Sequence, residues 1–138
     1  MKVIDGTNLI MGRLCARVSK DLLKGEQVTI TNPDKIIISG GIDFVAAKYT
    51  QRRDMQNKAT PEHTPKWPRP PNMLLRKIMS GMMPKKTSRG RQALKRLRIT
   101  QAGMSVEGAS TIKEIDGSHL TRSTTLGAVC KRIGWIQQ

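Results

Sequence analysis

The order of strand-like and helical patterns in the first forty residues restricts the fold more than any other feature of the chain. A short apolar run at residues 3–4 ends at the turn signal Asp5-Gly6. Apolar residues then recur at helical spacing over 11–22, and residues 27–31 alternate in the manner of a strand. Strand, helix and strand joined by short turns predict a crossover unit and therefore an α/β fold with a parallel sheet.

The rest of the chain continues this mixed pattern. The isoleucine run at 36–38 predicts a strand buried on both faces. Further elements are predicted in this order: helices over 42–53 and 74–82, a helix capped by Thr87 or Ser88, strands over 97–100 and 111–115, and a helix over 124–133. A length of 138 residues fits one domain, spanning 1–138.

The positive charge is concentrated in residues 48–98, called the basic tract below. This segment holds fifteen Lys and Arg residues against two acids, a net charge of +13 out of +15 for the chain. A field this one-sided repels itself unless a polyanion neutralises it, and nucleic-acid phosphate is the usual partner. The residues predicted to bind RNA are Arg52, Arg53, Lys58, Lys66, Arg69, Arg76, Lys77, Lys85, Lys86, Arg89, Arg91, Lys95 and Arg96.

Two neighbouring features bear on this prediction. Residues 57–72 contain five prolines, which predicts an extended loop that could order against RNA. Its Trp67 could stack on a base, although we expect it to pin the loop to its own domain. Within 13–24, a stripe of four basic side chains is either the solvated face of the first helix or an additional set of phosphate contacts.

The sequence contains no motif that predicts catalysis, a metal site, a cofactor or a small-molecule substrate. Residues 81–87 lack the second glycine of a phosphate-binding loop, and the two histidines lie in separate stretches without metal-ligand spacing. Asp5 is interpreted as a turn or capping residue. Cys15 and Cys130 are predicted to be buried thiols in a reducing cell interior. No apolar run approaches the length of a membrane span, so no membrane partner is expected.

One long central segment reads RKIMSGMMPKKTSRG at 76–90, followed by ALKRL at 93–97. Through this segment the chain resembles the universal large-subunit ribosomal protein thirteen family in its archaeal and eukaryotic form. The family pattern there is Arg-x-x-x-Gly-Met-Leu-Pro, then a glycine and Ala-Leu-x-x-Leu. IDG at 4–6 with MGRLCA at 11–16 is similar to the family's opening, and LG at 126–127 with GW at 134–135 is similar to its close.

This resemblance implies a three-layer sandwich with a small, mainly parallel sheet of about four strands flanked by helices. It also implies a non-catalytic structural constituent of the large subunit of the cytoplasmic ribosome, whose partners are large-subunit rRNA and neighbouring large-subunit ribosomal proteins. Two alternatives remain open at this stage. One is a free RNA-binding regulator of translation, and the other is a small nucleotide- or RNA-modifying enzyme with its site near Asp5 and Ser39.

Overall fold

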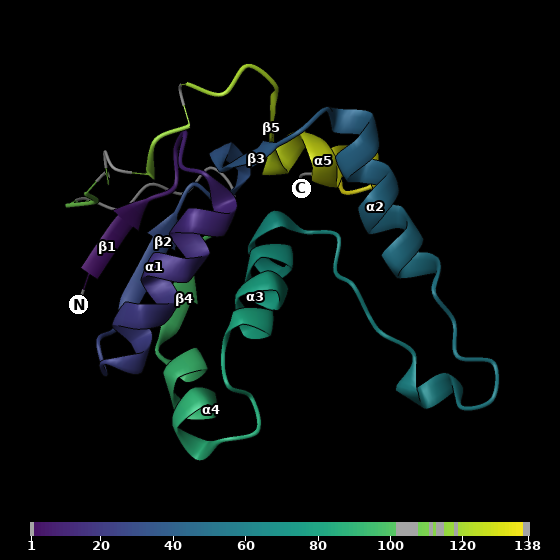
Figure 1. Cartoon of the computed structure of the whole chain (residues 1–138), viewed down its shortest axis with the longest axis horizontal. Coiled ribbons are helices and arrows are strands. Elements are labelled where there is room, and N and C mark those ends of the chain that lie inside the picture. The colour runs from purple at the N-terminus through teal and green to yellow at the C-terminus, as the bar shows by residue number, and fades with distance from the viewer. Residues whose placement is uncertain (1, 102–107, 111, 113–114, 118, 137–138) are drawn as a thin grey trace.

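The computed structural model describes residues 2–101, 108–110, 112, 115–117 and 119–136 (Figure 1). Its elements in chain order are β1 (Lys2–Asp5), α1 (Met11–Leu23), β2 (Val28–Thr31), the 3-10 turn η1 (Pro33–Lys35), β3 (Ile37–Ser39), α2 (Ile42–Asp54), the 3-10 turn η2 (Pro61–His63), α3 (Pro71–Met82), α4 (Ser88–Lys95), β4 (Leu97–Ile99), β5 (Ser123–Thr125) and α5 (Leu126–Arg132). The predicted helices are confirmed, except that residues 124 and 125, predicted to begin the last helix, belong to the strand β5. The predicted strand over 111–115 falls mainly on residues outside the described ranges.

The main sheet is parallel and has the strand order β1-β2-β4. Ile4 is paired with Ile30, and Ile30 with Ile99, so the first crossover runs from β1 through α1 to β2 as predicted. The free edge of β1 is covered by Ser110, whose backbone exchanges hydrogen bonds with Val3 and Asp5. The predicted α/β class and the small, mainly parallel sheet are confirmed.

The isoleucine run does not extend this parallel sheet. β3 instead forms an antiparallel pair with β5, in which Ile38 lies opposite Thr124. β2 is the central strand, with β1 on one side and β4 on the other, so β3 cannot pair beside it. The backbone groups of β3 form hydrogen bonds with β5 instead. Ile36 and Ile37 are buried, but Ile38 is only half-buried, so the prediction of a strand buried on both faces was wrong for that residue.

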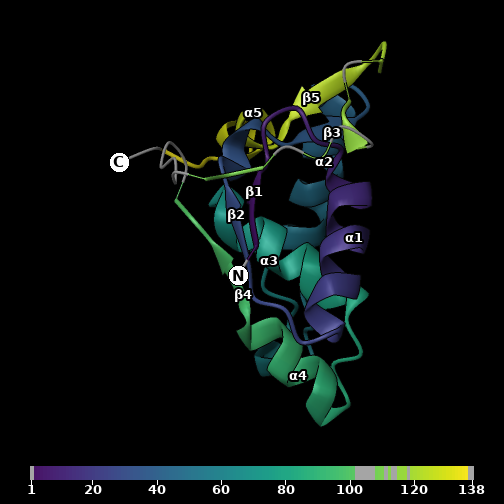
Figure 2. The same ribbon diagram turned by 90° about the vertical axis from the view of Figure 1, so that its left-hand side faces the viewer.

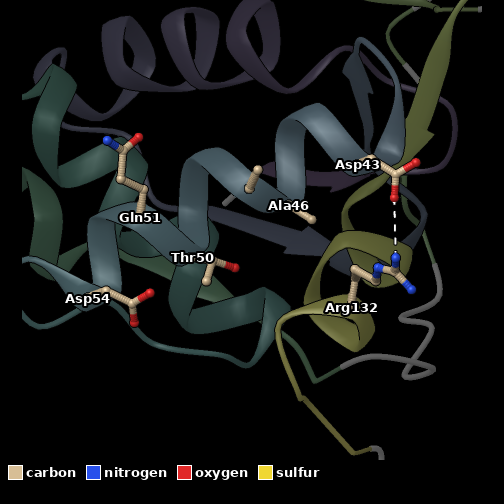
Figure 3. A pocket seen from close by; sticks show the side chains of 7 residues that line it. Asp43, Ala46, Thr50, Gln51, Asp54 and Arg132 are labelled. Atoms are coloured by element: carbon tan, nitrogen blue, oxygen red, sulfur yellow. Dashed lines mark hydrogen bonds and ion pairs between the residues drawn. The ribbon is translucent and has the colours of Figure 1, made fainter.

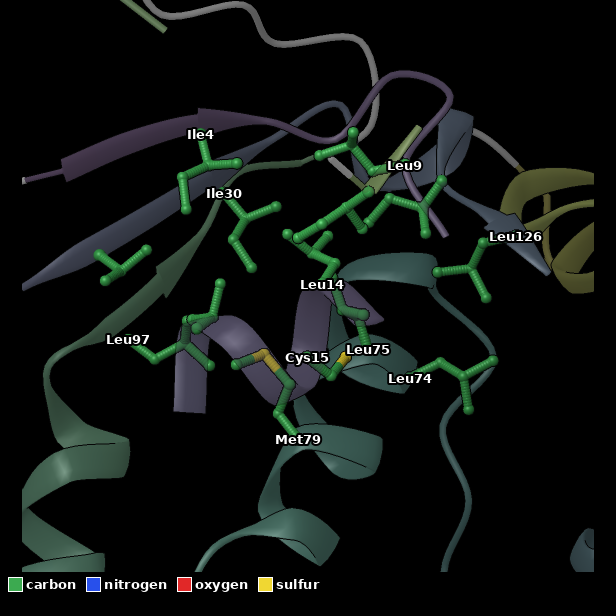
Figure 4. Close-up of a cluster of buried hydrophobic side chains, with 14 of the residues drawn as sticks. Ile4, Leu9, Leu14, Cys15, Ile30, Leu74, Leu75, Met79, Leu97 and Leu126 are labelled. Atoms are coloured by element: carbon green, nitrogen blue, oxygen red, sulfur yellow. The ribbon is translucent and has the colours of Figure 1, made fainter. Parts of the chain in front are cut away.

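The core lies between the parallel sheet and the helices α1 and α3 (Figures 1 and 2). Ile4, Ile30 and Leu97 project from the three strands toward this layer (Figure 4). Their neighbours on the strands, such as Thr29 and Arg98, point to the other face and are more exposed, which is the alternation expected of a strand. The core is therefore almost entirely aliphatic, as the low aromatic content requires.

Two cysteines from opposite ends of the chain are buried in this core. Cys15 lies on α1 and Cys130 on α5, and neither forms a disulfide bond. Burial raises the pKa of each thiol to about 12. The prediction that both are buried thiols is therefore confirmed.

These thiols should react with a thiol reagent such as Ellman's reagent only after the protein unfolds. In the folded protein the thiolate, which is the reactive form, is disfavoured at pH 8. The free energy of unfolding should be insensitive to these groups below the ordinary thiol pKa of 9.0 and should fall between that pH and about 12, because only the unfolded chain then loses the protons. Rapid labelling of the native protein at pH 8 would contradict the packing described here.

Candidate nucleic-acid interface

The cations of the basic tract are not neutralised by acids within the described part of the chain. The ion pairs formed there are Lys2 with Asp21 and Glu26, and Arg132 with Asp43. All of these residues lie outside 48–98. A tract of fifteen cations and two acids, whose cations form no ion pair with a described residue, is suited to a polyanionic partner.

One group of predicted residues holds the segment between α2 and α3, residues 55–70, which is called the arm below. The guanidinium of Arg52 lies 4.9 Å from the centre of the Trp67 ring, and the ammonium of Lys77 lies 5.9 Å from it. Arg53 donates a hydrogen bond from Nη1 to the carbonyl of Trp67 at 2.9 Å. The ring of Trp67 also approaches Tyr49, with 6.0 Å between centroids. The expectation that Trp67 pins the loop to its own domain is confirmed.

A second group binds the carboxyl end of α1. Arg89 donates from Nη2 to the carbonyl of Leu23 at 3.0 Å, and Arg96 donates from Nη1 to the carbonyl of Leu22 at 3.4 Å. The last carbonyls of a helix lack partners within the helix and carry partial negative charge, so cationic donors stabilise them. These two arginines therefore fasten α4 to α1.

Arg76 plays a similar part between α3 and α4. Its guanidinium donates to the carbonyls of Leu94 and Leu97 at 3.4 Å and 3.3 Å. Six of the thirteen predicted residues thus have structural contacts: Arg52, Arg53, Arg76, Lys77, Arg89 and Arg96. Each of these six side chains remains at least partly exposed to solvent, but each also makes a contact within the protein.

Replacing Arg89 with alanine is expected to lower the free energy of unfolding by about 1 kcal/mol, the usual net value of one hydrogen bond, because the charged bond lies at the surface, where solvent weakens it. Arg91 lies on the same helix and its side chain bonds to no residue that the structure describes, so Arg91→Ala is the matched control and should change stability by less than about 0.5 kcal/mol. Urea denaturation of the purified variants measures both values. Equal effects of the two substitutions would argue against the bond to α1.

The other seven predicted residues are exposed, and their side chains have no hydrogen-bonding or ion-pair partner among the described residues. They are distributed over the arm (Lys58, Lys66 and Arg69), the turn between α3 and α4 (Lys85 and Lys86) and α4 itself (Arg91 and Lys95). In Figure 1, α4 lies at the lower left and the 3-10 turn of the arm at the lower right, both on the side away from β3, β5 and α5. We call these seven side chains the free cations.

The turn between α3 and α4 is held in one shape by its own residues. Thr87 caps α4, because its Oγ1 accepts a hydrogen bond from the amide of Gly90 at 3.2 Å and donates to the carbonyl of Pro84 at 3.0 Å. Gly90 is buried against Pro84, and a Cβ atom there would lie 2.2 Å from the Pro84 carbonyl oxygen. Lys85 and Lys86 are therefore presented by a rigid turn, and the predicted cap at Thr87 is confirmed.

The basic stripe on α1 adjoins this region. Arg13, Arg17, Lys20 and Lys24 are all exposed, and the stripe ends beside α4 because Arg89 bonds the last turn of α1. The sequence spacing predicted that these residues share one helical face. It could not predict that this helix lies next to α4, which is more than sixty positions away in the sequence. The structure therefore places the carboxyl-terminal end of the stripe beside the basic tract.

The residues considered for catalysis have structural contacts instead. Asp5 Oδ1 accepts hydrogen bonds from the amide and hydroxyl of Thr7 and from the side-chain amide of Asn32. Partial burial acts to raise its pKa, but these hydrogen bonds outweigh burial and the pKa is lowered. Asp5 is therefore a turn residue, as interpreted from the sequence. In the described ranges, no three His, Cys or carboxylate side chains come together as a metal site, and no helix is long and apolar enough to cross a membrane.

Comparison with known proteins matches residues 1–102 to the family model described as ribosomal protein L13. The large ribosomal subunit protein uL13 of Methanosphaera stadtmanae is 40% identical over 136 residues, which cover 96% of each chain. The uL13 proteins of Thermoplasma acidophilum and Aeropyrum pernix are 34% and 37% identical, covering 97% and 96% of this chain and 98% and 89% of their own. These relatives are all archaeal.

Proposed function

Because the chain belongs to the ribosomal protein L13 family, we propose that it is a structural constituent of the large ribosomal subunit and that its basic tract binds large-subunit rRNA. Family membership confirms the resemblance found in the sequence and the prediction that the protein is not an enzyme. It also supports a location in the cytoplasmic ribosome. Neighbouring large-subunit proteins are the second class of partner that we propose.

The proposal that the chain binds rRNA is based on the free cations. Seven exposed Lys and Arg side chains, lying on the arm, the α3–α4 turn and α4, have no described partner within the chain. Each can contact a phosphate and release the counterions condensed on it, which is the main source of affinity for structured RNA. Arginine can bind a phosphate through two donors, whereas lysine acts as a mobile point charge.

The remaining cations of the tract support the free ones by fixing the backbone that presents them. Arg52, Arg53 and Lys77 hold the arm through Trp67, and Arg89 holds α4 against α1. A fixed array of charges favours RNA whose phosphates already have a matching arrangement, because little ordering cost remains on binding. Trp67 is occupied within the protein, so base stacking should contribute little to recognition.

The free regulator of translation remains the alternative, because the same surface could hold an mRNA element. Sedimentation of a gentle cell lysate on a sucrose gradient distinguishes the two. Our proposal expects the protein to move with the large subunit at low salt and to leave it only at high salt. Finding most of the protein at the top of the gradient at low salt would refute the structural role and favour the regulator.

A further inference from the structure

A groove runs along the exposed side of α2 (Figure 3), and none of the free cations lines it. It has a volume of about 600 Å³, and its lining includes the small apolar side chains of Ala46 and Ala47. Asp43 and Asp54 lie at its two ends, and Arg132 of α5 reaches into it. The two acids are eleven residues apart on one helical face, or about 16 Å, which is the length of three helical turns.

An exposed aromatic side chain borders this groove. Phe44 is the only phenylalanine of the chain and is 75% exposed, whereas Tyr49 on the same helix is 5% exposed. Phe44 precedes Ala47 by three residues and Gln51 by seven, so helical geometry places it beside the groove wall. Ile42, at the start of the helix, is also exposed. Exposed apolar side chains that gather beside a groove with a polar rim are a common feature of protein-binding sites.

The charge of the groove argues against RNA as that molecule. Asp43 is paired with Arg132 at 3.4 Å, whereas Asp54 forms no ion pair with a described residue. The groove therefore carries about one net negative charge on a chain of +15. Arg52 and Arg53 of the same helix are turned toward Trp67 and do not line the groove. A carboxylate without a counter-charge repels phosphate and attracts a cationic side chain.

We propose that the α2–α5 groove binds a segment of a neighbouring large-subunit protein. The segment places an apolar side chain against Ala46 and Ala47 beside Phe44, and a lysine or arginine against Asp54. The aromatic and apolar side chains supply the buried contact, and the carboxylate sets the register of the segment. This inference rests on the proposed function, and it assigns the α2–α5 groove to a protein partner and the basic tract to RNA.

Photo-crosslinking in assembled subunits tests this assignment. A benzophenone amino acid is placed at Thr50, which lines the groove, and in a second variant at Lys86, which belongs to the basic surface. In purified large subunits, Thr50 should crosslink to a protein segment that contains both apolar and basic residues, and Lys86 should crosslink to rRNA. Adding Asp54→Lys should reduce the Thr50 adduct at least about tenfold, because it places like charges together.

The outcomes are separable. A Thr50 adduct to rRNA, no adduct at all in subunit-bound protein, or a protein adduct unaffected by Asp54→Lys would each overturn the groove assignment. A missing rRNA adduct at Lys86 would instead contradict the proposed function, whatever the Thr50 variant shows.

Discussion

Replacing Lys85, Lys86 and Arg91 together with alanine is expected to weaken binding to large-subunit rRNA about a hundredfold at physiological salt. All three side chains are exposed and have no described partner in the protein. Each lost phosphate contact should also reduce the slope of log affinity against log salt by roughly 0.7 to 0.9, so the slope should become shallower by about 2 to 3. Filter binding or fluorescence titration over a range of salt concentrations measures both quantities.

The matched control removes three exposed cations outside the basic tract. Lys35, Arg122 and Lys131 satisfy this condition, and their replacement with alanine changes the net charge of the protein by the same amount. The control should lose little affinity, because its loss acts only through the long-range field, which salt screens. Equal losses in the two triple variants would mean that net charge, and not the basic tract, determines binding.

The substitution Gly90→Ala is expected to destabilise the protein by about 3 kcal/mol or more, because the new Cβ atom would lie 2.2 Å from the carbonyl oxygen of Pro84. That oxygen belongs to the backbone and is itself bonded to Thr87, so it cannot move without opening the turn between α3 and α4. Thermal or urea unfolding of the variant measures the loss. The variant should also bind rRNA more weakly even where it remains folded, because Lys85 and Lys86 would no longer be presented in their native positions.

Gly81→Ala is the control for this prediction. Gly81 lies on α3, and a Cβ atom there has no neighbour within 4 Å. Alanine favours a helix over glycine, so Gly81→Ala should be neutral or stabilise the protein by up to about 1 kcal/mol. A Gly90→Ala variant as stable as Gly81→Ala would show that the close contact with Pro84 does not exist.

The elements of this fold follow closely from local sequence patterns, whereas their pairing does not. The helical periodicity over 11–22 and the cap at Thr87 depend on residues a few positions apart, and both were predicted. The partner of the isoleucine run could not be, because it is β5, some 85 positions away, and β5 is short and polar. Without that partner in view, the run at 36–38 was predicted to be a strand buried on both faces.

The candidate site shows the same division. The basic tract could be located from the sequence alone, because the density of Lys and Arg can be counted along the chain. It could not separate free cations from those with structural contacts, because the carbonyls bound by Arg89 and Arg96 lie 66 and 74 positions away. The sequence also could not reveal the groove on α2. The residue that points to this groove is the exposed Phe44, and its exposure is known only from the fold.

The most direct test of the central claim is the salt dependence of rRNA binding by the unmodified protein. If each of the seven free cations contacts one phosphate, log affinity should fall with log salt with a slope of about −5 to −6. A slope in that range would support phosphate neutralisation by the basic tract as the source of binding. A slope shallower than about −2, with affinity retained at high salt, would contradict it and point to recognition by contacts other than charge.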